Sequence, residues 1–161
     1  MIIIRYGTYT IYNGIEMPII EYYGHGLDQE TTENHRYITC PKECGQMEGF
    51  FYDTLSDKYK KDVLIKDLTN AFFVVTKASY KGEVFEVQPY FGDDVHIHLI
   101  TRSREVGKRY KFYKFQDGVG KPYYLGEVTN LDIEKLWEER TTTKYNLPMP
   151  QGVEFYKEIP I

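Results

Sequence analysis

Residues 76–85 have the sequence Thr76-Lys77-Ala78-Ser79-Tyr80-Lys81-Gly82-Glu83-Val84-Phe85. Strand-forming residues stand on both sides of Lys81-Gly82, and a Tyr-x-Gly junction of this kind is typical of a tight β-hairpin. Glycine supplies the positive φ that such a turn requires. The stretch therefore predicts two antiparallel strands and favours a mainly β fold.

The same pattern occurs earlier in the chain, which predicts an internal repeat. Residues 8–17 have the same Tyr-x-Gly junction, at Tyr12-Asn13-Gly14. Three further pairs of segments match in order, and they are 35–39 with 96–101, 49–53 with 110–115, and 65–70 with 125–130. We expect one compact domain over residues 1–161, with two tandem antiparallel β-meander repeats at about 5–70 and 76–140 and an extended C-terminal tail at 141–161.

The end of the second repeat predicts one short helix near residues 130–140, which makes the expected fold mainly β with a small α component. Ile133, Leu136 and Trp137 are spaced i, i+3 and i+4, and Thr129 or Asn130 is a suitable N-cap.

The composition restricts the class of protein. Among 161 residues, aromatic side chains make up 16% and include 16 tyrosines, which favours strands and recognition surfaces. The formal net charge of −4 argues against nonspecific attraction to nucleic acid or anionic membranes. The first residues form too short an apolar run for a signal peptide, and no stretch is long enough for a membrane span, so we expect a cytoplasmic protein.

Two histidines supply the main alternative in the enzyme class. His96 and His98 alternate on a predicted strand, so their side chains project on one side, and Asp94 is near in sequence. Such a set can serve a metal-dependent hydrolase or phosphodiesterase. Cys40 and Cys44 resemble half of a zinc site, but the chain has no second cysteine pair to complete it. We therefore expect no catalytic residue, no metal and no cofactor.

A basic segment supplies a second alternative. Residues 102–114 carry six cationic side chains and one acidic side chain, with aromatic residues between them. A small nucleic-acid-binding β-barrel can use such a segment. The other interpretation is an edge hairpin whose charges prevent association of sheets.

The Tyr-x-Gly junctions and the closing Thr-Asn elements, with Glu134-Lys135-Leu136-Trp137-Glu138-Glu139-Arg140 after the second, resemble those of small proteins of Gram-positive bacteria. Some of these are immunity proteins of polymorphic or LXG-type toxins. The resemblance implies a non-enzymatic protein that neutralises a cognate toxin by binding it. We expect a protein partner, for which a basic toxin domain is the candidate, and the oligomeric state stays open.

The expected partner-binding residues lie on predicted loops and on the histidine strand. They are Tyr22, Tyr23, Tyr90, Asp93, Asp94, His96 and His98.

Overall fold

The computed structural model describes residues 2–21, 34–89, 95–116 and 118–161. These residues are mainly β, with antiparallel strand pairs, which confirms the expected fold class. The chain forms two compact units. Unit 1 comprises residues 1–6, 74–140 and 154–161, and unit 2 comprises residues 7–73 and 141–153.

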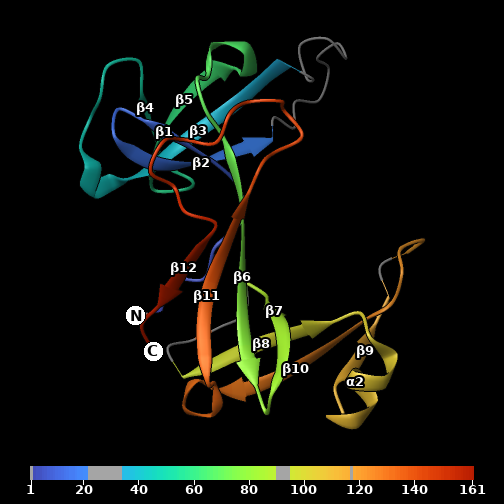
Figure 1. Cartoon of the computed structure of the whole chain (residues 1–161). Helices are drawn as coiled ribbons and strands as arrows, with labels where there is room; N and C mark the ends of the chain where they lie inside the picture. The colour runs from blue at the N-terminus through green and yellow to red at the C-terminus, as the bar shows by residue number, and fades with distance from the viewer. Residues whose placement is uncertain (1, 22–33, 90–94, 117) are drawn as a thin grey trace. The chain divides into compact units, whose positions relative to one another are not determined.

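Unit 2 holds the first half of the strands, in the order β4-β5-β3-β2-β1 (Figure 1). Their bounds are β1 Tyr6–Tyr12, β2 Ile15–Glu21, β3 His35–Pro41, β4 Phe51–Asp53 and β5 Lys58–Leu64, with short 3-10 turns at Lys42–Cys44 and Ile65–Asp67. The core of unit 2 includes Met17, Ile38, Phe50 and Val63, and Leu147 from the 141–153 segment packs against it.

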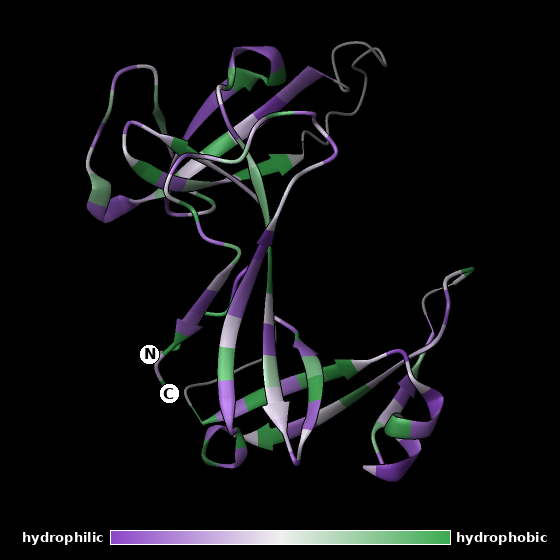
Figure 2. Cartoon of the chain, in the orientation of Figure 1, coloured by the Kyte–Doolittle hydropathy of each residue, from purple (hydrophilic) through white to green (hydrophobic). Residues whose placement is uncertain are grey.

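Unit 1 holds the second half, in the order β6-β7-β8-β10-β9, while β11 pairs with both β6 and β12. The elements are β6 Phe72–Tyr80, which starts in unit 2, β7 Glu83–Val87, β8 His96–Thr101, α2 Arg104–Arg109, β9 Tyr113–Phe115, β10 Tyr123–Thr129, a 3-10 turn at Asn130–Asp132, β11 Lys135–Thr141 and β12 Tyr156–Ile159. Apolar and polar residues are interleaved along β8 and β10 (Figure 2). Phe85, Ile97, Leu99 and Leu136 lie in the core of unit 1.

Both Tyr-x-Gly junctions form the predicted hairpins. Tyr12 pairs with Ile15 across the first turn, and Tyr80 pairs with Glu83 across the second. In each turn both central residues have positive φ, 49° and 75° at Asn13-Gly14 and 51° and 77° at Lys81-Gly82. Two consecutive left-handed residues give the twist that antiparallel neighbours need. The boundary between units, at residues 73 and 74, falls between the predicted repeats, and their equivalence stays a prediction.

The helix expected near residues 130–140 is wrong, because this segment is a 3-10 turn followed by strand β11. Burial along β11 alternates, with Leu136, Glu138 and Arg140 inside. The Glu138 carboxylate accepts hydrogen bonds from Arg5 and Arg140. The spacing of Ile133, Leu136 and Trp137 fits one face of a helix, whereas the period-2 burial of this segment identifies a strand. In the tail expected to be extended, residues 156–159 form β12 and pair with β11.

A second difference concerns the basic segment, which contains helix α2 where strand or hairpin structure was expected. The Ser103 side chain caps this helix by accepting a hydrogen bond from the Val106 amide. Glu105 lies in the first turn, and Lys108 and Arg109 lie in the last, as the helix dipole favours. Within the described ranges, no helix has the length and apolar character needed to cross a membrane.

Candidate functional site

Five of the seven expected partner-binding residues lie outside the described residues. They are Tyr22, Tyr23, Tyr90, Asp93 and Asp94. His96 and His98 are described, and both lie on β8. Their partner-binding role stays a prediction.

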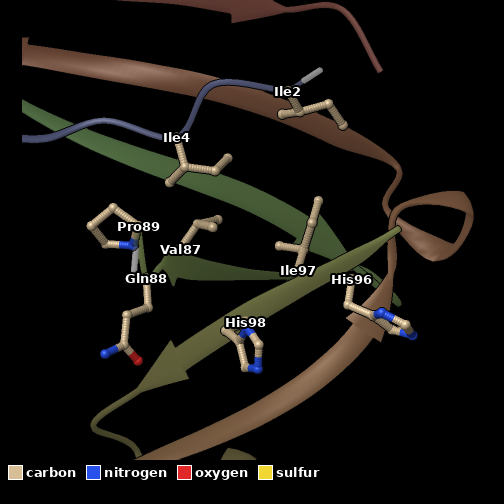
Figure 3. A pocket seen from close by; sticks show the side chains of 8 residues that line it. All are labelled: Ile2, Ile4, Val87, Gln88, Pro89, His96, Ile97 and His98. Atoms are coloured by element: carbon tan, nitrogen blue, oxygen red, sulfur yellow. The ribbon is translucent and has the colours of Figure 1, made fainter. Parts of the chain in front are cut away.

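The histidine pair has the alternation expected from the sequence. Figure 3 shows both imidazoles on one side of β8, with Ile97 on the other side. His98 Nε2 lies 3.1 Å from a carboxylate oxygen of Glu127 on the neighbouring strand β10. The pair is half-buried at the edge of a small cavity, which Ile2, Ile4 and residues 87–89 also line.

The cavity beside the histidines is too small for an ordinary substrate. Its volume is about 70 Å³, whereas small-molecule sites enclose on the order of 300–1,000 Å³. The buried Oε1 atom of Gln88 accepts no hydrogen bond from the described part of the chain. A polar space of this size suits ordered water, which occupies about 30 Å³ per molecule. The cavity therefore favours a small hydrated pocket over a reaction chamber.

Within the described ranges, the structure shows no third ligand that would complete a metal site. No group of three or more histidine, cysteine, aspartate or glutamate side chains within them is placed to hold an ion. Cys40 and Cys44 are free thiols. Burial, together with the neighbouring Cys44, raises the pKa of Cys40 to about 11, so this thiol stays protonated at neutral pH. The hydrolase alternative would need Asp94, which the structure does not describe.

A surface that the sequence did not indicate lies on the outer face of unit 2. Ile20 on β2 is opposite Tyr37 on β3, and Lys60 on β5 is opposite both Thr39 and Phe51. Residues that are opposite in an antiparallel pair, or two apart on one strand, share a face. Ile20, Tyr37 and Phe51 thus form one apolar patch, and Ile38 and Val63 on the same strands point into the core.

The apolar patch is exposed and internally ordered. Ile20 is 41% exposed and Phe51 is 49% exposed. The rings of Tyr37 and Phe51 pack edge to face with centroids 6.2 Å apart, and Lys60 Nζ lies 5.9 Å from the Tyr37 centroid. Aromatic side chains held in one orientation lose little entropy on binding, so such clusters are effective contact surfaces.

Carboxylates border the apolar patch. Hydrogen bonds from Lys60 and Ser56 lower the pKa of Asp53 to about 2, so its carboxylate is charged at all physiological pH values. Asp62 lies beside Tyr37 in register, is 49% exposed, and has the His35 ring 3.1 Å away. The patch therefore combines an apolar centre with a charged rim, which is the usual composition of a protein-binding surface.

The apolar patch can be recognised only when the pairing register of the strands is known. Phe51 lies in the repeat segment 49–53 and Tyr37 in the repeat segment 35–39, but the sequence alone does not show that β3, β5 and β2 place them on the same face as Ile20. Comparisons with known protein families, with curated proteins and with solved structures give no match to this chain.

Proposed function

We propose that the protein is a non-enzymatic binding protein that docks a basic protein partner on the apolar patch of unit 2. The observation that carries this proposal is the exposed cluster of Ile20, Tyr37 and Phe51 with its charged rim. Exposed apolar clusters rimmed by polar groups are typical of protein interaction sites. The pairing of aromatic anchors with fixed charges supports specific recognition.

The distribution of charge supports a basic partner. Unit 2 contains 11 acidic and 7 cationic side chains, whereas unit 1 contains 13 of each, so the net charge of −4 comes from unit 2. A negative surface accelerates encounter with a positive partner and discriminates against acidic ones.

The specific form of this proposal is an immunity protein that neutralises a toxin. The support for it is the resemblance of the repeat motifs and the acidic character of unit 2, which suits a cationic toxin domain. We place its action in the cytoplasm, where the free thiols of Cys40 and Cys44 would stay reduced.

Affinity capture from the native host tests the proposal. The tagged full chain is compared with a variant that combines Ile20→Asp and Phe51→Asp and with the control Leu131→Asp. Leu131 is 91% exposed and belongs to unit 1, so the control adds one aspartate away from the patch, whereas the double variant adds two within it. We expect wild type and the control to retain a basic protein and the double variant to lose it.

Two results would overturn docking on the patch. One is equal recovery of the partner by all three proteins, and the other is recovery of no basic protein by the wild type. If the recovered protein is the product of a neighbouring gene and is toxic when expressed alone, the immunity form of the proposal is supported. Circular dichroism of each variant verifies that the substitutions leave the fold intact.

A further inference from the structure

Unit 1 contains a pocket lined by four cationic side chains. Arg102 follows β8, Arg104 and Lys108 belong to α2, and Lys114 belongs to β9. Pro122 and Tyr124 complete the lining, and the open pocket encloses about 420 Å³, within the range of ligand sites. We call this the basic pocket. Figure 1 shows α2 beside β9 and β10.

The local fold explains why these cations converge. Tyr124 is opposite Thr101 of β8 and opposite Lys114 of β9, so Lys114 and Tyr124 share a face of the sheet. Helix α2 packs on this face through Gly107, where an added β-carbon would overlap the Tyr124 ring. Arg104 and Lys108 are four residues apart, so they point to the same side of the helix.

Within the part of the chain that the structure describes, the cations of the basic pocket lack the acidic partners that Arg109 has on helix α2. Arg109 pairs with both Glu83 and Glu105. Among the described residues, no acidic side chain pairs with Arg104, Lys108 or Lys114. Like charges at positions i and i+4 are unfavourable by a few tenths of a kcal/mol. The cations therefore create a region of positive electrostatic potential, and a bound anion would reduce the repulsion between them.

We propose that the basic pocket binds phosphate groups, and that a single nucleic-acid strand supplies them. Arginine presents a planar fork of donors that matches phosphate oxygens, and lysine adds a mobile charge. The adjoining edge strand β9 also offers aromatic rings. Tyr113 is 77% exposed, and Phe115 stacks on Tyr123 with centroids 5.6 Å apart. Bases stack on such rings while cations contact the backbone.

This proposal is independent of the docking surface on unit 2, because all of its residues belong to unit 1. It also refines the expectation drawn from net charge. Residues 102–114 have six cations and one acid, whereas the rest of unit 1 has seven cations and 12 acids. A protein that is acidic as a whole thus presents one strongly positive site.

The test measures binding of the full chain to fluorescent 12-nucleotide oligo-U and oligo-dT by anisotropy at several salt concentrations. Unlabelled ATP and pyrophosphate form a second arm, measured by calorimetry. The pocket variant combines Arg104→Gln, Lys108→Gln and Lys114→Gln. The control is Lys111→Gln, which removes a cation of the same segment that does not line the pocket. Thermal melts verify that each protein is folded.

We expect the wild type to bind the oligonucleotides with a log–log salt slope of about −2 to −3, since each phosphate contact contributes about 0.7 on a single strand. The pocket variant should bind about tenfold more weakly or worse, with a smaller slope, while the control stays within about twofold. If the wild type binds ATP or pyrophosphate but not the oligonucleotides, and the pocket variant binds neither, the result supports a phosphate site whose ligand is a free phosphate compound. Binding of neither probe, or equal binding by the pocket variant and the control, would overturn the proposal.

Discussion

The buried carboxylate of Glu138 is the residue on which the interior of unit 1 depends most. Arg5 Nε and Nη2 donate to its two oxygens at 2.6 and 2.7 Å, and Arg140 Nε and Nη2 donate at 3.0 and 2.9 Å. The Glu138 side chain is 5% exposed and that of Arg140 is 6% exposed. One carboxylate thus pairs with two guanidinium groups, and this triad joins the N-terminal segment to β11.

Replacing Glu138 by glutamine should strongly destabilise the protein. The variant keeps the shape of the side chain but removes the charge that pairs with two largely buried guanidinium groups, and loss of one member of a buried ion pair costs about 3–5 kcal/mol. Urea unfolding followed by circular dichroism measures the loss. Glu86→Gln, at an exposed position on β7, is the control and should change stability by less than about 0.5 kcal/mol. A loss no larger than that of the control would contradict the role of the triad.

The same carboxylate predicts a pH dependence. Burial raises the pKa of Glu138, but the hydrogen bonds from Arg5 and Arg140 outweigh burial and lower it below the ordinary value of 4.5. A lowered folded-state pKa stabilises the protein above the unfolded-state pKa, and this contribution disappears as the pH falls through the folded-state pKa. The difference in unfolding free energy between wild type and Glu138→Gln should therefore narrow as the pH falls below 4.5. A difference that stays constant from pH 7 to pH 3 would contradict this assignment.

At the scale of elements, the two hairpin turns depend on their glycines. Gly14 and Gly82 have φ values of 75° and 77°, and a left-handed conformation costs a residue with a side chain about 1–2 kcal/mol. No atom lies within 4 Å of a β-carbon added at either position, so strain is the only penalty. Gly14→Ala and Gly82→Ala should each destabilise the protein by about 1–2 kcal/mol in urea unfolding. A neutral effect of both would show that the turns relax without cost.

Helix α2 depends on a different property of glycine, its small size. A β-carbon on Gly107 would overlap Cγ of Tyr124, which cannot move away without shifting β10. Overpacking of this kind costs about 1–3 kcal/mol. Gly107→Ala should lower the melting temperature and weaken oligonucleotide binding, because the helix carries Arg104 and Lys108. Glu105→Ala, at an exposed helix position, should leave the melting temperature nearly unchanged. If the Gly107→Ala variant is destabilised but binds oligonucleotides as tightly as the wild type, the position of helix α2 does not control binding at the basic pocket.

These elements also show what the sequence could predict. The hairpins were predictable because a Tyr-x-Gly turn is a local signal. Strand β11 was not, because Ile133, Leu136 and Trp137 fit a helical spacing, and the burial of Glu138 depends on Arg5, 133 residues away. Helix α2 did have a local signal in its Ser103 cap and charge order, but the aromatic residues after it favoured a strand interpretation.

At the scale of the whole molecule, the two units carry different charges and different candidate surfaces. Unit 2 has the net negative charge and the apolar patch, and unit 1 has the basic pocket. The apolar patch could not be predicted from the sequence, because the face on which Ile20, Tyr37 and Phe51 meet is set by pairing between strands that are distant in the chain. The basic pocket was partly predictable, because four of its six lining residues lie in the segment 102–114.

Site-specific photo-crosslinking in the native host tests the central claim most directly. A photoreactive phenylalanine analogue replaces Phe51 in the apolar patch or, as the control, Leu131 in unit 1. We predict that position 51 forms an adduct with one basic protein and that position 131 does not, because only the first lies at the docking surface. Absence of an adduct at position 51, or the same adduct at both positions, would contradict the claim that this face of unit 2 binds a protein partner.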